Sequence, residues 1–401
     1  MEIKYFTYTT LFSFSLLAIV GCSRGSDAIS ADHLQAATVK PVPLIMSNNF
    51  TPEGDKTLLF IGQDSDTISD YINSVPEDNI EAVTLYTGLK NADPHKTLKG
   101  LFKNVNYGAG NNNFPLTLAE SPDAALAIGL AFDNCNQDNH EGNIANGSYD
   151  QTIKYMIEHL KSLAPRKVFL RIGYEFDGPW NCYSPQNYIA SFKKIAKAIK
   201  DQGASNITTV WQSAAWLDSW GNPLYDIRKD THLDNWYPGD GVVDWVGMSV
   251  FFRTLSQWNY VPPITPEKSQ KKILDFAKAH NKPVMIAESA PMGIRIGELT
   301  AGYIQINQPI AKTPDQIWQT WYQPYFDFID TNKDVIRAVA YINTHWESQS
   351  MWQCQPDIPA GQPGCSQANW GDSRIQANEE IKARWLKQIN NSERWIQTSQ
   401  Y

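Results

Sequence analysis

Eight short apolar segments recur between residues 57 and 346 of the chain. Each runs almost without polar interruption, which is typical of parallel strands that are buried on both faces. The segments cover residues 57–63, 82–88, 124–132, 167–175, 207–214, 243–251, 282–289 and 336–346. We therefore predict eight parallel strands.

Helical periodicity lies between the later segments. Apolar residues recur on one face along residues 149–163 and again along residues 187–200, as expected for amphipathic helices. Residues 266–280 and 314–330 follow, each with a proline at the expected first turn. Residues 373–390 are expected to form a closing helix.

The alternation of strands and helices predicts an α/β protein, a single (β/α)8 TIM barrel with long loops on the catalytic face. We place this barrel at residues 53–395. The competing fold is a doubly wound open sheet, which would require a glycine-rich phosphate-binding loop after the first strand. Residues 60–64 read FIGQD instead, so the barrel is favoured.

The N-terminal segment is typical of an exported protein. Residues 1–22 have a short basic start and an apolar core, residues 11–20, that is too short to span a membrane as a mature helix. They end in Ile-Val-Gly-Cys, which resembles a bacterial lipobox, and the resemblance implies cleavage before Cys22 and its lipidation. The alternative is an ordinary signal peptide in which the cysteine is incidental.

The residues after the predicted lipidation site indicate where the protein is held. Ser23 follows Cys22 in place of aspartate, which favours the outer membrane, on its surface or its periplasmic face. Residues 23–52 are polar and lack strong periodicity, so we predict a tether.

Charge and composition limit the classes of molecule that the protein is expected to bind. The net charge is −8 and the pI is about 5.4, which disfavours nucleic acid because a phosphate-binding protein needs a basic face. The chain has 14 Trp and 18 Tyr, and aromatic rings in polar loops suit stacking on the apolar faces of sugar rings. Core packing is the alternative for at least half of them.

Four cysteines remain after Cys22, and an even number in an exported protein indicates disulfides. Three pairings are possible. We favour Cys354–Cys365, which closes a loop rich in proline and glycine, and Cys135–Cys182, which would join loops after neighbouring strands. Zinc and other metals are not expected, because CxxC and HExxH spacings are absent from the sequence. No cofactor is expected.

The barrel fold directs attention to the carboxyl ends of the strands, where the chemistry of such barrels lies. The residues at or near these ends are Gln63, Asp64, Tyr86, Asp133, Glu175, Asp177, Trp211, Gln212, Phe251, Phe252, Glu288, His345 and Trp346. Two glutamates, Glu175 and Glu288, follow the fourth and the seventh predicted strand.

This pair of glutamates matches the needs of glycoside hydrolysis. One carboxyl group must be protonated to assist the leaving oxygen, and the other must be ionised to attack the anomeric carbon or to activate water. Arg171 precedes Glu175 by four positions, so we expect it to point into the same barrel interior and to keep the nucleophile ionised. The alternative for each glutamate alone is a salt bridge at the barrel rim.

The motif LRxxxE at residues 170–175, together with KPVMIAE at residues 282–288, resembles the clan A glycoside hydrolases, and within them family 26, the mannanases and β-1,3-xylanases. The resemblance implies that Glu175 is the acid/base and Glu288 the nucleophile. It also implies that Trp346 forms the floor of the subsite that holds the sugar to be cleaved.

The chain departs from that family at two positions. Tyr174 stands where family 26 has His and most other clan A families have Asn, and Phe251 stands where a Tyr usually bonds to the nucleophile. The stretches FIGQD, RIGYEFDGPWN and WYPGDxxVDWVG also resemble bacterial hydrolases related to family 26, and the β-carrageenase family 167, which acts on a marine galactan, is a further relative to weigh.

Further candidates each carry a structural alternative. Asp177 is expected to bind a sugar hydroxyl or orient the acid, or else to be a turn residue. Trp180 is a candidate sugar platform or a loop anchor. Gln63 and Asp64 are candidates for sugar binding, with helix capping as the alternative for Asp64. At least one of Trp211 and Gln212 is expected to contact substrate.

Four other polar side chains complete the candidates. Asn343 and His345 are expected to point inward beside Trp346. Arg253 and Arg295 could bind sulfate or carboxylate on a substrate, although rim salt bridges are favoured for both.

These observations predict a surface-anchored, monomeric, retaining β-glycoside hydrolase that acts within a polysaccharide chain. Mannan, β-1,3-xylan, glucan and a marine galactan all remain open as substrates. One competing interpretation is a surface glycan-binding lipoprotein on a catalytically inactive barrel, and another is an inverting hydrolase, whose carboxyl groups would lie further apart.

Overall fold

The computed structural model describes residues 49–132, 135, 138–253, 262–302, 310–353 and 370–397. The predicted signal peptide, the lipidation site at Cys22, most of the predicted tether and the predicted pair Cys354–Cys365 lie outside these residues.

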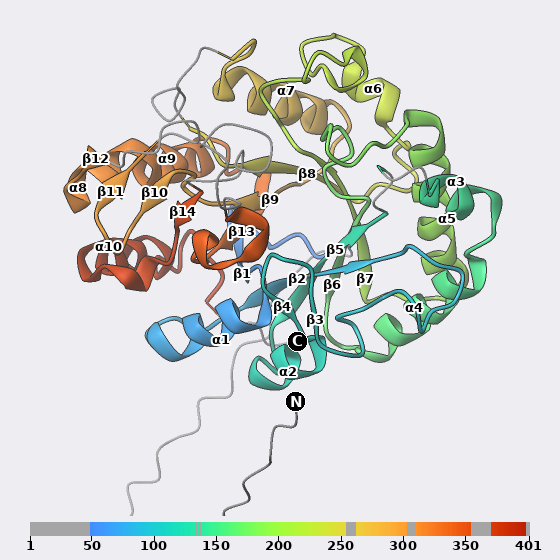
Figure 1. The fold of residues 1–401 in the computed structure, drawn as a ribbon, viewed down its shortest axis with the longest axis horizontal. Helices are drawn as coiled ribbons and strands as arrows, with labels where there is room; N and C mark the ends of the chain where they lie inside the picture. The colour runs from blue at the N-terminus through green and yellow to red at the C-terminus, as the bar shows by residue number, and fades with distance from the viewer. Residues whose placement is uncertain are drawn as a thin grey trace, which may run out of the picture. The chain divides into compact units, whose positions relative to one another are not determined.

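The eight predicted strands close into one barrel in which every neighbouring pair is parallel (Figure 1). Around the barrel the order is β1, β2, β5, β6, β7, β8, β9 and β13, and β13 pairs with β1. The strands are β1 (Leu58–Gly62), β2 (Ala82–Gly88), β5 (Ala125–Ala131), β6 (Val168–Ile172), β7 (Ile207–Ser213), β8 (Trp245–Val250), β9 (Val284–Ser289) and β13 (Ile336–Ile342). The prediction of a (β/α)8 barrel is confirmed.

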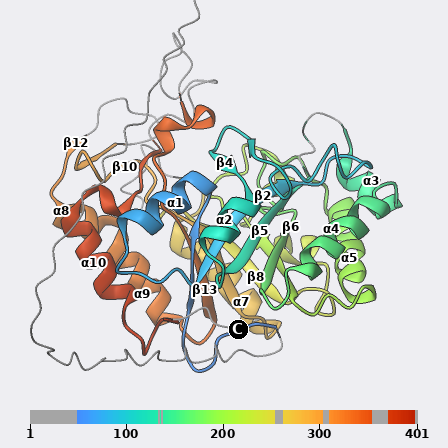
Figure 2. The same ribbon diagram turned by 90° about the horizontal axis from the view of Figure 1, so that it is seen from below.

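Helices surround the barrel (Figures 1 and 2), and their buried apolar residues share one core cluster with outward-facing residues of the strands. They are α1 (Ser65–Ser74), α2 (Phe114–Glu120), α3 (His140–Asn146), α4 (Asp150–Ser162), α5 (Pro185–Asp201), α6 (His232–Trp236), α7 (Pro266–Ala279), α8 (Pro314–Ile317), α9 (Gln323–Thr331) and α10 (Glu379–Ile389). Proline occupies the first turn of α5, α7 and α8, where its missing N–H has no helical partner to lose.

Two helices differ from the prediction. The segment predicted as one helix at residues 314–330 contains a π-helical turn, Trp318–Tyr322, between α8 and α9. The closing helix starts at Glu379 and not at residue 373, because the Asn378 side chain accepts hydrogen bonds from the first free backbone N–H groups. The residues before it form the short strand β14 (Gly371–Asp372) and a 3-10 turn.

Two small sheets lie in the loops. A four-stranded sheet joins β10 (Ile294–Arg295), β11 (Thr300–Ala301), β12 (Ile310–Ala311) and β14. It therefore links the loops that follow β9 and β13. A hairpin of β3 (Val105–Asn106) and β4 (Asn111–Asn112) stands in the long connection after β2.

The barrel interior changes character along its axis. Alternate strand residues point inward, and those towards the amino ends of the strands form an apolar plug. The plug contains Phe50, Leu58, Phe60, Ala82, Ala125, Ala127, Phe169, Val210, Trp245, Met285, Ala287, Ala338, Ala340 and Ile396. Further along the same inward-facing rows the residues become polar: Thr84, Arg171, Gln212 and Ser249 are all buried. The plug therefore closes one end and leaves the polar end for chemistry.

A bulge between β8 and β9 decides where Glu288 points. Met248 pairs with Ile286, but the next residue, Ser249, pairs with Glu288, so Ala287 has no partner opposite it. Ala287 belongs to the interior plug, and strict alternation would turn Glu288 outward. The extra residue resets the alternation, so that Glu288 and Ser249 both face the interior.

Candidate active site

Arg171 lies at the centre of the polar end and is fully buried. It extends from β6 across the interior to form an ion pair with Oε1 of Glu288 on β9. Its other N–H groups donate to Gln212 at 2.9 Å, to Thr84 at 3.2 Å and to the carbonyl oxygen of Ala287 at 3.1 Å. A buried guanidinium needs such full satisfaction, and here Glu288 is one of its partners.

Gln212 and Ser249 connect the two glutamates. The amide of Gln212 donates to Oε1 of Glu288 at 3.3 Å and to Oγ of Ser249 at 3.1 Å. The hydroxyl of Ser249 in turn donates to Oε1 of Glu175 at 2.7 Å. Residues of β7, β8 and β9 and of the loop after β6 thus form one hydrogen-bonded network around both carboxyl groups.

Glu175 stands just past the end of β6 in a backbone conformation that is uncommon for a residue with a side chain. Its φ is +53°, and Gly173 has a φ of +55°. The turn is held by Asn181, whose side-chain amide donates to the carbonyl oxygens of Tyr174 and Glu175 at 3.2 and 2.9 Å. The backbone N–H of Phe176 donates to the carbonyl of Gln212 at 3.0 Å. This turn carries Glu175 back over the barrel mouth.

Burial raises the pKa of Glu175 to about 8, and the nearby negative charge of Glu288 acts in the same direction. Hydrogen bonds from Ser249 and Trp180 and the charge of Arg171 oppose the shift. Glu175 is therefore protonated at neutral pH while Glu288 is paired with Arg171. One carboxylic acid and one carboxylate in adjacent positions are the combination that glycoside hydrolysis needs.

Two tyrosines pack against the arginine and, edge to face at 5.3 Å between ring centroids, against each other. The guanidinium carbon of Arg171 lies 4.9 Å from the ring centroid of Tyr86 and 5.2 Å from that of Tyr174, as in cation–π contacts. Burial strongly raises the pKa of both tyrosines, so both keep their hydroxyl protons. Gly129 makes room for Tyr86, because a Cβ at Gly129 would lie 2.4 Å from the Tyr86 ring. Tyr174, which departs from the family pattern, thus contacts the arginine of the site.

Three site residues had no assigned role from the sequence: Thr84, Tyr86 and Ser249. The spacing of residues along the predicted strands could have identified them. Thr84 and Tyr86 follow Ala82 at intervals of two on β2, and Ser249 follows Trp245 at an interval of four on β8, so all continue the inward-facing rows. Polar residues at inward positions of a buried strand require a partner, which here is the arginine or the acid.

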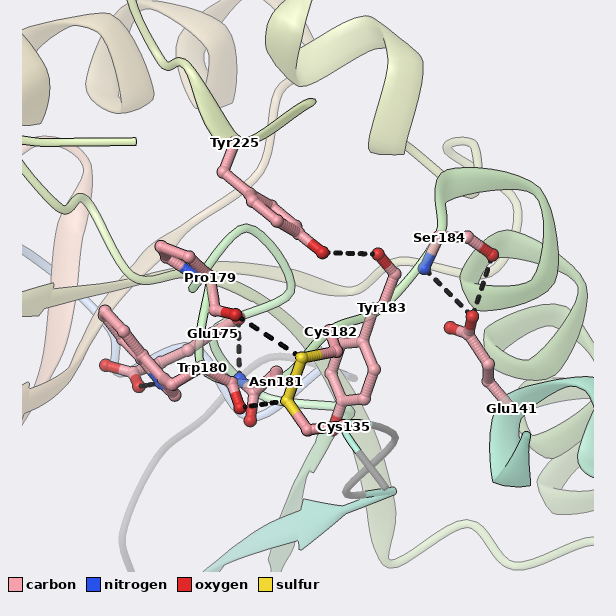
Figure 3. Close-up of a disulfide and its surroundings, with 10 residues drawn as sticks. All are labelled: Cys135, Glu141, Glu175, Pro179, Trp180, Asn181, Cys182, Tyr183, Ser184 and Tyr225. Atoms are coloured by element: carbon pink, nitrogen blue, oxygen red, sulfur yellow. Dashed lines mark hydrogen bonds between the residues drawn. A yellow bond between two sulfur atoms is a disulfide. The ribbon is translucent and has the colours of Figure 1, made fainter. Parts of the chain in front are cut away.

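Trp180 contacts the acid directly, as Figure 3 shows, and its indole N–H donates to Oε2 of Glu175 at 3.0 Å. Its ring packs against Trp216 and Trp220 from the loop after β7, with ring centroids 5.2 and 5.7 Å away. The structure therefore brings Trp180 into the site, together with two tryptophans that the sequence did not single out.

Asp177 has contacts that agree with one of the two roles expected for it, the orientation of the acid. It is buried, and its carboxylate accepts from Ser213 Oγ and from the backbone N–H of Ala214, both at 2.7 Å, and contacts His232 Nε2 at 3.0 Å. These protein partners occupy both oxygens. Asp177 thus ties the loop that carries Glu175 to the end of β7 and to α6, and it does not present itself to a sugar.

Two aromatic candidates are also corrected. Trp211 points outward, away from Gln212, and stacks on Phe176 at 4.4 Å in the core between barrel and helices. Trp346 is 1 % exposed, and its indole N–H donates to Ser373 at 3.0 Å. A ring with so little exposed surface cannot serve as the floor for a sugar, so neither tryptophan stacks on substrate in this conformation.

Phe251 belongs to the same aromatic cluster as Trp346. Its ring centroid lies 6.3 Å from that of Trp346 and 5.3 Å from that of Trp370. Phe251 is buried and has no hydroxyl group to offer the nucleophile. The hydroxyl group that the sixth barrel strand does bring to the site, that of Ser249, bonds to the acid Glu175.

Asp64 caps α1: its carboxylate accepts from the backbone N–H of Thr67 at 3.1 Å, and the side-chain amide of Gln349 donates to it at 3.2 Å. Burial raises its pKa to about 6. The capping alternative therefore accounts for Asp64. Gln63 is buried immediately after β1.

The remaining polar candidates serve the framework in the described structure. Arg295 forms a two-pronged pair with Glu347, with bonds of 2.9 and 2.6 Å. Arg253 packs over the ring of Phe328 and bonds to Gln270 on α7. Asn343 accepts from the backbone N–H of Ile375 at 2.9 Å. His345 lies in an isolated bridge to β14.

The predicted disulfide Cys135–Cys182 is confirmed, with a Cα–Cα distance of 4.9 Å (Figure 3). It joins the loop after β5 to the loop after β6. Cys182 lies two residues beyond Trp180, so the crosslink restrains the segment that carries both Trp180 and Glu175.

Among the described residues, no cluster of three or more His, Cys, Asp or Glu side chains could hold a metal ion. The same part of the chain contains no helix that is long and apolar enough to cross a membrane.

The chain is similar to two known hydrolases in sequence. A β-1,3-xylanase of an Alcaligenes species and the β-1,3-xylanase TXYA of a Vibrio species are each 33% identical to it over 337 residues, 83% of this chain. The chain spans 63% and 65% of the lengths of these relatives, less than two thirds of each. No protein-family model matches the sequence.

Solved structures share the fold. A double mutant of the Cellulomonas fimi endo-β-1,4-mannanase superposes with a TM-score of 0.51 at 12% identity, covering 86% of this chain and 73% of that one. The barrel fold and the two glutamates at its strand ends agree with the resemblance to the clan A glycoside hydrolases. The chain is similar in sequence to β-1,3-xylanases and in fold to this mannanase.

Proposed function

We propose that this protein is a retaining, endo-acting glycoside hydrolase that cleaves β-1,3-xylan. The observation that carries the proposal is the pairing of an acid with a raised pKa, Glu175, and a carboxylate held by a buried arginine, Glu288, in one hydrogen-bonded network. Both sequence relatives are β-1,3-xylanases, and this similarity supports β-1,3-xylan as the first substrate to test.

In the first half of the reaction, Glu288 attacks the anomeric carbon as the bond to the leaving oxygen breaks, and Glu175 transfers its proton to that oxygen. Within the described residues, the hydrogen bonds and ion pair of Glu288 all end on Oε1, which leaves Oε2 for the attack. Arg171 stabilises the carboxylate of Glu288 before this step. It pairs with that carboxylate again when the bond between Glu288 and the sugar is broken.

In the second half, Glu175 removes a proton from water as the water oxygen attacks the anomeric carbon and the bond to Glu288 breaks. Glu175 is an anion between the two halves, until it takes this proton, and the hydrogen bonds from Ser249 and Trp180 stabilise that anion. The two steps regenerate both carboxyl groups and retain the configuration at the anomeric carbon. No cofactor takes part in this scheme.

The test is a panel of polysaccharides that includes β-1,3-xylan, mannan, mixed-linkage glucan and carrageenan, with product sizing and proton NMR of the first product formed. We expect short β-1,3-xylo-oligosaccharides of several lengths, released initially as the β-anomer. Initial release of the α-anomer would indicate an inverting mechanism and contradict the retaining one. Cleavage of another glycan would change the substrate.

The competing function is glycan binding without cleavage. Glu175→Gln and Glu288→Gln variants keep the size of each side chain and remove its acid–base chemistry, and we expect each to lower kcat by about 10³-fold or more while substrate still binds. If the wild type binds a glycan of the panel but cleaves none of them, the binding function is correct.

We also propose that the protein is a monomer anchored to the bacterial outer membrane through lipid on Cys22. The sequence Ile-Val-Gly-Cys at residues 19–22 and the following Ser23 support this location. Metabolic labelling with radioactive palmitate tests it: the wild type should incorporate label and fractionate with the outer membrane. A Cys22→Ser variant that is labelled equally would contradict the anchor.

A further inference from the structure

Three tryptophans stand side by side next to the acid. Trp180 bonds to Glu175, and its ring contacts the rings of Trp216 and Trp220, both from the loop after β7. Trp220 is 62 % exposed, the most exposed of the large hydrophobic side chains in the described structure. Trp180 and Trp216 are each partly exposed. The group forms an open aromatic surface that begins at the catalytic carboxyl group.

The loop holds Trp220 in its exposed position. The backbone N–H of Trp220 donates to the Asp218 side chain at 2.9 Å, and its φ is +50°, a conformation that side-chain-bearing residues adopt rarely. Trp216 anchors the loop, since its ring lies 5.9 Å from that of Phe252. Residues held in such rarely populated conformations cluster at active sites and ligand-binding sites.

We infer that Trp216 and Trp220 form a sugar-binding subsite that holds the xylan chain on the leaving-group side of the cleaved bond. This inference rests on the proposed function. The side is set by Trp180, because its N–H bonds to the carboxyl group that protonates the leaving oxygen. A sugar seated beyond that oxygen meets Trp180 first and the Trp216–Trp220 surface next.

The subsite makes the enzyme favour long substrates. A leaving group of a single aryl ring ends near Trp180, whereas a leaving oligosaccharide continues onto Trp220 and gains contact there. The Trp220→Ala variant should therefore lower kcat/KM for long β-1,3-xylo-oligosaccharides about tenfold, equivalent to about 1.4 kcal/mol, and leave kcat/KM for p-nitrophenyl β-1,3-xylobioside unchanged.

Two control variants sharpen the comparison. Trp220→Phe keeps an aromatic face and should retain most of the activity on long substrates. Leu224→Ala removes another exposed apolar side chain from the same connection, 38 % exposed, and should change neither substrate's kcat/KM. Thermal unfolding of each variant checks that the barrel is intact.

The outcomes separate the inference from the function on which it rests. A wild type that cleaves no glycan removes the proposed function, and the subsite with it. An active wild type whose Trp220→Ala variant is equally active on long substrates overturns the subsite alone. Equal losses on long and aryl substrates also overturn it, because they indicate a structural role. A change from dimer to monomer in ultracentrifugation with unchanged kinetics would identify Trp220 as a self-association contact instead.

Discussion

Ser249 donates its hydroxyl hydrogen to Oε1 of Glu175 at 2.7 Å, and the direction of this bond is fixed from the far side of the barrel. Arg171 can only donate hydrogen bonds, and its Nε bonds to the carbonyl oxygen of the Gln212 side chain at 2.9 Å. The amide nitrogen of Gln212 must then point to Ser249. A donated N–H leaves the Ser249 hydrogen free for Oε1 of Glu175, while Oε2 accepts from the indole of Trp180, so donors hold both oxygens of the acid.

The first prediction concerns this hydroxyl. Removing it in Ser249→Ala takes away a hydrogen bond that stabilises ionised Glu175 and holds its pKa down. The pKa of Glu175 should rise by about one unit, the amount expected for a hydrogen bond to a charged group. The basic limb of the pH profile of kcat/KM should move to higher pH by that amount.

Ser249→Thr is the matched control, because it keeps the hydroxyl and should keep the wild-type pH profile. A merely structural role for Ser249 would lower activity at every pH without moving the limb. That result would remove the directed hydrogen-bond network from the mechanism.

The second prediction is the pH dependence of the wild type. Glu175 must be protonated to act as the acid, and its pKa is raised to about 8. Activity should therefore be retained through neutral pH and fall tenfold per unit once the pH exceeds about 8. Measured kcat/KM values between pH 5 and 10 test this. A basic limb near pH 5 would show that Glu175 is not desolvated as described.

The third prediction concerns the buried ion pair. Arg171→Met leaves the carboxylate of Glu288 buried without its cation, which should lower the free energy of unfolding by about 3–5 kcal/mol. In the background of Glu288→Gln the same substitution should cost clearly less, because no buried charge remains unpaired. Urea unfolding of the four proteins gives the coupling energy.

Additive effects of the two substitutions would contradict the ion pair. A coupling of about 1 kcal/mol or more, with the double variant more stable than the sum predicts, supports it.

The fourth prediction concerns the crosslink between the loops after β5 and β6. The Cys135–Cys182 bond closes a separation of 47 residues, so replacing both cysteines by serine should lower the free energy of unfolding by about 2–4 kcal/mol. Because the bond restrains the segment from Glu175 to Cys182, kcat should fall as well. Comparison with reduced wild-type protein controls for the new hydroxyl groups. Unchanged unfolding and unchanged kcat would show that the loop is held by other contacts.

The sequence was sufficient to predict the barrel and the two glutamates. All eight predicted strands formed with boundaries shifted by only a few residues, because parallel strands buried on both faces must be continuously apolar and this requirement is local. The ends of the strands followed, and with them Arg171 and Gln212, which continue the inward-facing rows of Phe169 and Val210 at an interval of two.

The surroundings of several site candidates depended on contacts between distant segments. Trp211 and Gln212 are neighbours in the chain, but only the closed barrel shows that Gln212 faces inward and Trp211 faces the helices. Trp346 became a core residue because Trp352 and Trp370 pack around it. The carboxylate of Asp177 contacts Ser213 and His232, which lie 36 and 55 residues further along the chain.

The sequence by itself thus determined the fold class and the chemical groups available at the strand ends, because local patterns of apolar residues indicate which segments are buried strands and where they end. Only the tertiary structure decided how those groups act together. A bulge opposite Ala287 turned Glu288 inward beside Ser249, and the loops after β6 and β7 gathered Trp180, Trp216 and Trp220 beside the acid. Register shifts and loop contacts of this kind depend on the energy of the whole packed barrel, which no single segment encodes.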